Sequence, residues 1–317
     1  MRVHAAIENF QTVWRRPVEV VLLLVGLGFI AGIVVHHKDE FVHALKAIDG
    51  EMVFLAVLAA MPMYLLKAMY NARIIAALAN EAEPRRGIVA SYAVSQLVRY
   101  VPGKIWGVLY QSLRMSGQYR PEVVVLGNIV QYIFTNIFSL VVVMSIGLWH
   151  LGFFLPALLV LLGTVIVGHV CHKARRLGLP RYRFLRRHLE RASGECSGVS
   201  GVRGAMFLLT FDWIVYLCMW RLIVPEGFDW SETMLLAALY SSASLLSVVA
   251  AIAPGGLVVR EALFLLIGAQ FGFSESLLLS LGIVSRLVLT MSELSFAVLT
   301  VWGARLLGRL GAQQVTE

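Results

Sequence analysis

The chain has 317 residues, of which 59% are apolar and 15% are charged. Soluble domains are about 45–50% apolar and about 25% charged, so this composition excludes an ordinary soluble protein and leaves little room for a soluble catalytic domain. The 27 Lys and Arg against 19 Asp and Glu give a net charge of +8. In a membrane protein such an excess indicates how the chain is oriented in the membrane rather than binding to nucleic acid.

The N-terminal segment predicts a retained transmembrane helix. Arg15 and Arg16 precede apolar residues 17–35, and no small-residue cleavage site follows them. We therefore expect this helix to stay in the membrane rather than to be removed as a signal peptide.

Six apolar stretches are long enough to span a membrane, since a helix needs about 20 residues to cross about 30 Å of hydrocarbon. The sequence therefore predicts an all-α integral membrane protein, a polytopic helical bundle with about six full spans. The stretches are 17–35, 52–78, 123–148, 153–172, 205–224 and 276–305.

Two further apolar stretches, 88–113 and 233–272, are interrupted by proline and glycine, so neither is predicted to be one uninterrupted helix. The first contains the segment YVPGKIWG and the second contains APGGLVVRE. The interrupting residues are Pro102 and Gly103 in the first stretch, and Pro254, Gly255 and Gly256 in the second.

Lys and Arg in short loops mark the cytoplasmic side of a membrane. Loop 173–203 holds nine of them against two Glu, so we expect it in the cytoplasm, against the anionic inner leaflet. The same rule predicts that both termini of this multi-pass protein lie in the cytoplasm. The membrane we expect is a bacterial inner membrane. Arginines also flank both ends of 88–113, so this stretch is expected to enter from the cytoplasm and return.

Stretch 233–272 follows a connection without basic residues, so it is expected to begin and end outside. The two broken stretches are thus predicted to be re-entrant elements from opposite faces. Two full crossings by the second stretch are the alternative.

The spacing of these elements suggests an internal repeat. The prolines of the two breaks lie 152 residues apart, and the spans before and after the breaks are offset by 153 residues. Within one membrane domain, 1–317, this divides the chain into halves 17–148 and 153–305 of opposite orientation. Such inverted-topology repeats are typical of transporters, whose interrupted helices point to the substrate site. A coincidence of helix lengths is the alternative.

The breaks carry positive charge. Backbone that leaves a helix at membrane depth must be buried in protein or line a wet cavity, and the helix after each break directs its free N–H groups toward it. Lys104 and Arg260 follow the breaks, and Arg99 precedes the first by about one turn. We expect these residues, with the Pro and Gly residues of both breaks, to bind an anion, unless the breaks merely kink packed helices.

Ionisable residues inside spans are candidates for function, because their burial in lipid is costly. Arg286 lies about 15 Å into the last span, and Glu293 follows seven residues later on the same helical face. Arg286 is expected to bind a phosphate, and Glu261 to offset Arg260 or another nearby cation. Asp212, Glu261 and Glu293 are candidates for proton coupling, with structural pairing as the alternative.

Two other groups are interpreted as structural. Asn128, Tyr132 and Asn136 form a polar stripe at helical spacing, which favours interhelical hydrogen bonds. His169 and His172 flank Cys171, but no third and fourth ligands follow at a suitable spacing, so we expect no metal site.

The YVPGKIWG and APGGLVVREALFLL segments, with the intramembrane Arg286 some 25 residues after the second break, resemble the flippase-like transmembrane region of lysylphosphatidylglycerol synthases and their single-domain relatives. Some of those relatives are linked to glycolipid and hopanoid pathways. The resemblance covers about residues 17–308 and implies movement of a lipid with an anionic or polar headgroup between leaflets. The synthases carry a soluble aminoacyl-transfer domain after this region; the chain ends at Glu317 without one, so lysyl transfer is not expected.

We therefore expect a flippase-like lipid translocator, not an enzyme, that moves an anionic lipid such as a phospholipid or an undecaprenyl-phosphate-linked sugar. No GxxxxGK[ST] motif for ATP occurs, and no cofactor and no nucleic-acid partner are expected. A glycosyltransferase is a conceivable protein partner. The alternatives are a membrane-embedded lipid or glycolipid transferase, or an accessory subunit of one.

Overall fold

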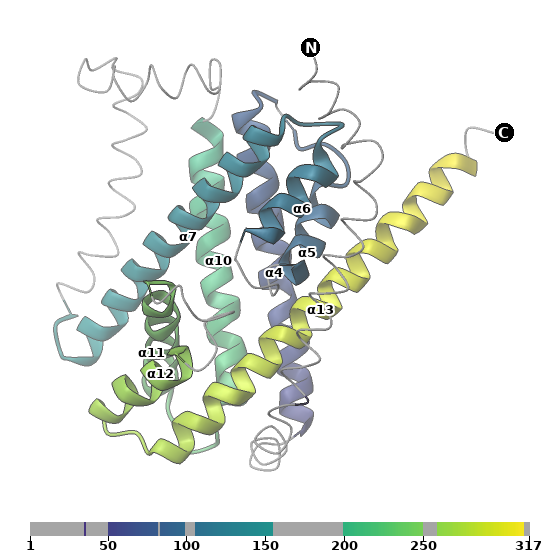
Figure 1. Ribbon diagram of the computed structural model, residues 1–317. Helices are drawn as coiled ribbons and strands as arrows, with labels where there is room; N and C mark the ends of the chain where they lie inside the picture. Colours follow the sequence, from purple (N-terminus) through teal and green to yellow (C-terminus); the bar gives the residue numbers. More distant parts are fainter. Residues whose placement is uncertain are drawn as a thin grey trace, which may run out of the picture.

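The computed structural model describes residues 35, 50–81, 83–98, 105–154, 199–249 and 259–313. These residues form eight helices and no strand, which agrees with the predicted all-α class (Figure 1). In chain order the helices are α4 (Gly50–Leu78), α5 (Ile88–Val98), α6 (Trp106–Met115), α7 (Pro121–His150), α10 (Val199–Ile223), α11 (Trp230–Val249), α12 (Val259–Gln270) and α13 (Glu275–Gln313). The expected spans 17–35 and 153–172, and residues 173–198 of the basic loop, lie outside the described residues.

Three of the described helices are long and apolar enough to cross a membrane: α4, α7 and the Glu275–Gly303 part of α13. They correspond to three of the six predicted spans. A helix that faces lipid must present apolar side chains outward, and α7 does so along most of its length. Its exposed apolar residues include Ile129, Ile133, Phe134, Ile137, Leu140 and Met144.

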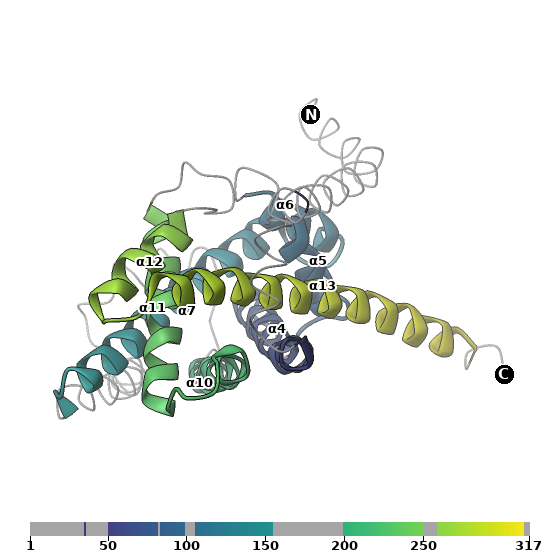
Figure 2. The ribbon, with the colours of Figure 1, turned by 90° about the horizontal axis from the view of Figure 1, so that it is seen from below.

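Each interrupted stretch forms two helices that pack against each other, which one continuous helix cannot do. Val94 and Val98 of α5 form a buried cluster with Tyr110 of α6. In the second stretch, the rings of Tyr240 in α11 and Phe264 in α12 meet edge to face with centroids 5.3 Å apart. Figures 1 and 2 show each pair side by side, with the two pairs at different places along the bundle.

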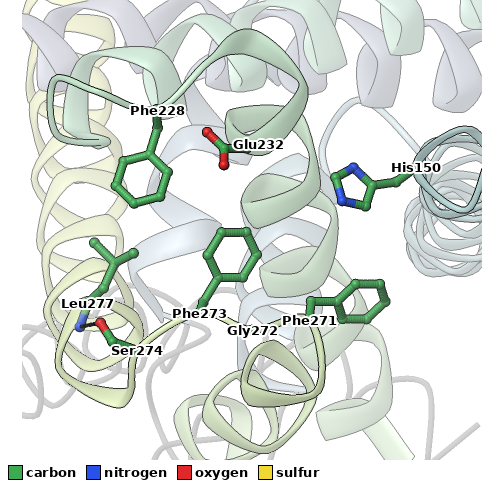
Figure 3. Close-up of a pocket in the computed structure, with 8 residues that line it drawn as sticks. All are labelled: His150, Phe228, Glu232, Phe271, Gly272, Phe273, Ser274 and Leu277. Atoms are coloured by element: carbon green, nitrogen blue, oxygen red, sulfur yellow. Dashed lines mark hydrogen bonds between the residues drawn. The ribbon is translucent and has the colours of Figure 1, made fainter.

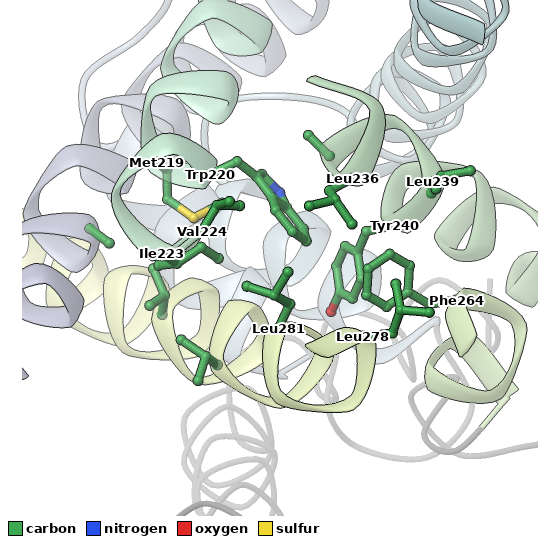
Figure 4. Close-up of a cluster of buried hydrophobic side chains, with 14 of the residues drawn as sticks. Met219, Trp220, Ile223, Val224, Leu236, Leu239, Tyr240, Phe264, Leu278 and Leu281 are labelled. Atoms are coloured by element: carbon green, nitrogen blue, oxygen red, sulfur yellow. The ribbon is translucent and has the colours of Figure 1, made fainter. Parts of the chain in front are cut away.

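The main apolar core lies where α4, α10, α11, α12 and α13 meet (Figure 4). At its centre Trp220 of α10 packs against Tyr240 and Phe264, with ring centroids 5.4 and 6.1 Å away. Aromatic rings at these separations add stabilisation beyond the area they bury. This core therefore fixes the broken pair α11 and α12 on α10 and α13.

Helix α13 crosses the whole bundle, as Figure 2 shows. Its first part packs on α12, since Leu278 and Leu281 share the main core with Phe264. Further along, Phe296 and Ala297 share a second cluster with Tyr92 of α5. One long helix thus connects the two broken pairs.

The connection between α4 and α5 is fastened to the turn between α6 and α7. The backbone N–H of Arg85 donates to the Tyr119 hydroxyl at 2.8 Å, and the Arg85 guanidinium lies over the Tyr119 ring, 5.2 Å from its centroid. Burial raises the pKa of Tyr119 above its ordinary value. The hydrogen bond and the ring contact hold the two connections together.

Candidate functional site

The structure brings Arg260, Glu261 and Arg286 together in what we call the arginine–glutamate cluster. Oε1 of Glu261 accepts hydrogen bonds from Arg260 Nη2 at 3.0 Å and from Arg286 Nη1 at 3.1 Å. Arg260 Nε is 3.3 Å from the same oxygen. The expectation that Glu261 offsets a nearby cation is confirmed, and the residue serves two arginines rather than one.

The cluster is largely withdrawn from the surface and keeps a positive charge. The side chains of Arg260, Glu261 and Arg286 are 20, 17 and 13% exposed. The formal charges of these three side chains, two guanidinium groups and one carboxylate, sum to +1. A partly buried positive charge of this kind favours the binding of an anion.

The ring of Tyr240 in α11 packs against the cluster at Arg260. The Arg260 guanidinium lies over it at 4.8 Å from the ring centroid, which is within the range of a cation–π interaction. Residue-by-residue analysis of the sequence did not find Tyr240, because its contact with Arg260 depends on the fold of α12 back onto α11.

Local structure explains how the cluster forms. Arg260 and Glu261 lie in the first turn of α12, where a carboxylate interacts favourably with the positive end of the helix. The connection between α12 and α13 is short, and Gly272 within it has a φ of +84°. Residues other than glycine rarely adopt this backbone conformation. This turn sends α13 back along α12 and brings Arg286 opposite Glu261.

The second carboxylate oxygen of Glu261, Oε2, is buried and has no hydrogen-bond partner among the described residues. A buried acceptor without a donor costs free energy. The cluster therefore combines two guanidinium groups, which suit a phosphate, with one acceptor that suits a hydroxyl.

Seven of the expected site residues belong to the two breaks themselves, and all of these lie outside the described residues. They are Arg99, Pro102, Gly103, Lys104, Pro254, Gly255 and Gly256. The described part of the candidate site is thus its α11–α12–α13 side.

The other two candidate acids, Asp212 and Glu293, are both buried. Asp212 of α10 is 6% exposed and pairs with Lys67 of α4, with 3.7 Å between Oδ1 and Nζ. Glu293 of α13 is 1% exposed. The next residue back, Ser292, donates to the carbonyl of Val57 in α4 at 2.8 Å, so this part of α13 lies against α4.

A buried amide network, of which sequence analysis anticipated only Asn128, joins α4, α6 and α7. Asn71 Nδ2 donates to Gln131 Oε1 at 2.7 Å, Gln111 Nε2 donates to Asn71 Oδ1 at 2.8 Å, and Asn128 Nδ2 donates to Gln111 Oε1 at 2.8 Å. Gln131 also donates to the Tyr92 hydroxyl at 3.1 Å, which adds α5. Amides inside apolar spans were the available signal, and satisfied pairing favours a structural role.

The predicted polar stripe on α7 is therefore only partly correct. Asn128 makes interhelical hydrogen bonds, as expected. Tyr132 is 52% exposed, and Asn136 donates to the Tyr132 carbonyl in its own helix, so the interpretation is wrong for these two. They face away from the other described helices because the packed face of α7 is narrow.

No family model, curated protein or solved structure matches this chain.

Proposed function

We propose that this protein moves an anionic lipid between the leaflets of a bacterial inner membrane, with the arginine–glutamate cluster as part of its headgroup site. The observation that carries the proposal is the sharing of Glu261 by Arg260 and Arg286 inside the bundle. Guanidinium groups bind phosphate through paired, charge-assisted hydrogen bonds. A phosphate headgroup would carry the charge opposite to that of the two guanidinium groups.

The position of the cluster supports the same function. Two of its three residues, Arg260 and Glu261, lie in the first turn of α12, shortly after Pro254, Gly255 and Gly256 in the sequence. A helix that begins inside a membrane protein directs its free N–H groups at an anion, as the interrupted helices of transporters do. Oε2 of Glu261 would accept a hydrogen bond from a glycerol or sugar hydroxyl of the headgroup.

An inverted repeat is part of the proposal. Each half contains a long helix, a second helix, a break, a short helix and another long helix, and α6 and α12 begin 153 residues apart. The four network amides Asn71, Gln111, Asn128 and Gln131 have counterparts 153 residues later that all belong to the main apolar core. These are Val224, Phe264, Leu281 and Val284.

With six full spans and two re-entrant elements, the halves would rock against each other around a shared headgroup site. The acyl or polyprenyl chain would stay in lipid while the headgroup crosses. The lipid gradient or ions would supply energy, and Asp212, Glu261 and Glu293 are the candidate proton carriers. Both termini and the basic loop 173–203 would lie in the cytoplasm.

The substrate proposed is a phosphate-bearing lipid such as a phospholipid or an undecaprenyl-phosphate-linked sugar. The resemblance of the two Pro-Gly segments to the flippase-like region of lysylphosphatidylglycerol synthases supports this choice. A lipid-linked sugar would make a glycosyltransferase a natural partner.

A vesicle assay tests the proposal. The purified chain is reconstituted with a fluorescent phosphatidylglycerol, and the label in the outer leaflet is destroyed by a reductant that does not cross the membrane. We expect the protein to expose the inner-leaflet label, so that the signal falls below the level reached in protein-free vesicles.

Arg260→Gln and Arg286→Gln should each slow this exchange by roughly 10- to 100-fold, since a hydrogen bond to a charged group contributes about 1.5–3 kcal/mol. Arg73→Gln, which changes an exposed arginine on α4, is the matched control and should exchange like the wild type. Equal rates for all variants would reject the cluster. Headgroup modification without exchange would favour a membrane-embedded transferase.

A further inference from the structure

A pocket of about 260 Å³ lies at the other end of α12 from the arginine–glutamate cluster. It opens between the end of α7, the connection from α10 to α11, and the turn from α12 to α13 (Figure 3). Half of the described residues that line it carry aromatic rings, and the one charged side chain among them is a carboxylate, whereas the cluster has an excess of guanidinium groups. Neither the sequence patterns nor the proposed transport uses it.

Three phenylalanine rings and an imidazole line this pocket: Phe228, Phe271, Phe273 and His150. The rings of Phe228 and Phe273 are 6.3 Å apart and inclined by 44°, so they form a concave wall rather than a flat stack. On the other side, Phe271 meets His150 edge to face with centroids 6.5 Å apart. The faces of aromatic rings carry partial negative charge and attract cations.

The positive φ of Gly272 separates the two rings that follow each other in the turn. As a result Phe271 and Phe273 extend to different sides, toward His150 and Phe228 respectively (Figure 3). The turn that brings Arg286 to Glu261 at one end of α12 thus builds the aromatic wall at the other end.

Glu232 supplies a carboxylate to the same pocket from the first turn of α11 (Figure 3). Its Oε2 accepts the backbone N–H of Asp229 at 3.0 Å, and Asp229 Oδ1 accepts the backbone N–H of Glu232 at 2.7 Å. This reciprocal capping holds the Glu232 side chain in one orientation. The carboxylate is therefore fixed in place before any ligand arrives.

The charge around the pocket is negative. No Lys or Arg is among the described residues that line it, and Glu226 and Asp229 belong to the same connection as Phe228. A carboxylate beside several ring faces is a combination that recognises ammonium groups. The rings replace water around the cation and attract it through the negative charge of their faces.

We propose that this pocket binds an alkylammonium group, such as the trimethylammonium group of choline, through Glu232 and the faces of Phe228, Phe271 and Phe273. The group can belong to a zwitterionic lipid headgroup or to a free solute, since both present the same chemistry. The proposal does not depend on lipid translocation by the arginine–glutamate cluster.

The test is titration calorimetry of the purified full chain in detergent with choline and with 3,3-dimethylbutan-1-ol, which has the same shape without the charge. We expect choline to bind at least about fivefold more tightly than the neutral alcohol, since each cation–π contact at an exposed site contributes about 0.5–1 kcal/mol. Equal affinity for both compounds, or no binding of choline, would overturn the proposal. This comparison uses the wild-type protein, so it does not depend on whether a variant folds.

Two variants identify the residues. Glu232→Gln keeps an acceptor for the Asp229 N–H and removes the charge, so choline should bind at least about tenfold more weakly. Phe273→Leu keeps an apolar side chain and removes a ring face, so it should also weaken the binding of choline. Glu226→Gln alters an exposed acid that does not line the pocket, and it should bind like the wild type. Wild-type affinity in both pocket variants would contradict the assignment.

The source of the ammonium group is settled in lipid nanodiscs. If a lipid headgroup occupies the pocket, choline binding should disappear in phosphatidylcholine discs and persist in phosphatidylglycerol discs. If the ligand is a free solute, binding should persist in both. Loss of binding in phosphatidylglycerol discs, where no ammonium lipid competes, would count against the site.

Discussion

Lys67 of α4 and Asp212 of α10 form an ion pair, with 3.7 Å between Nζ and Oδ1. The ammonium group of Lys67 also lies over the ring of Tyr64, at 5.7 Å from its centroid. The pair joins two helices that are far apart in the sequence and belong to different halves of the proposed repeat. Any rocking of the halves would have to preserve this contact or break it.

Breaking the pair from one side should destabilise the protein. Lys67→Met leaves the carboxylate of Asp212 buried without its counter-ion, and we expect a loss of about 3 kcal/mol, near the lower end for a buried pair because Lys67 is 26% exposed. Lys67→Arg keeps the charge and should lose much less. Thermal unfolding in detergent measures both.

The double variant Lys67→Met with Asp212→Asn separates pairing from packing. It removes both charges and should recover more than half of the stability lost by Lys67→Met alone. If the loss of stability in the double variant equals the sum of the losses in Lys67→Met and in Asp212→Asn alone, the two charges do not interact.

Close packing of α4 on α7 gives a second prediction. A Cβ added at Gly127 would lie 2.5 Å from Cγ1 of Ile75, which is fully buried. Gly127→Ala should therefore destabilise the protein by about 1–3 kcal/mol, because the packed helices must separate or Ile75 must leave its rotamer.

Gly147→Ala on the same helix is the matched control, since no atom of the described residues lies within 4 Å of a Cβ built there. It should be neutral or stabilise by about 0.5–1 kcal/mol through helix propensity. The same loss at both positions, measured by thermal unfolding, would show that α7 and α4 are not packed in this way.

The amide network gives a third prediction. Asn71→Leu removes the donor to Gln131 and the acceptor for Gln111, and should cost about 1–3 kcal/mol because buried amides are left unsatisfied. Asn136→Leu on α7 changes an amide that, among the described residues, donates to the Tyr132 carbonyl of its own helix, and it should have little effect. Indistinguishable melting temperatures for the two variants would exclude a structural network.

Much of the helical layout could be predicted from the sequence. Apolar length gives the ends of α4 and α7 to within two residues of 52–78 and 123–148. Proline and glycine predict that 88–113 and 233–272 are not single helices, because proline cannot continue the hydrogen-bonding pattern. Helix α13 continues to Gln313, beyond the expected residue 305, because no proline follows and Gly308 and Gly311 weaken a helix without blocking its hydrogen bonds.

The site residues could be predicted only where they are neighbours in the sequence or where a charged residue lies deep within an apolar span. Arg260 and Glu261 are neighbours, and Arg286 was singled out by its depth in a span. By contrast, the pairing of Lys67 with Asp212 depends on how α4 lies along α10, which no local pattern encodes. The contact between Tyr240 and Arg260 likewise depends on the fold of α12 against α11.

The central claim is that a phosphate-bearing headgroup sits at Arg260 and Arg286, and photocrosslinking tests it most directly. A phosphatidylglycerol analogue with a photoreactive headgroup is incorporated with the full chain, and labelled peptides are mapped by mass spectrometry. We predict that label concentrates on α11, α12 and α13 and falls in Arg286→Gln but not in Arg73→Gln. Labelling spread evenly over the exposed face of α7, and unchanged in Arg286→Gln, would contradict the account.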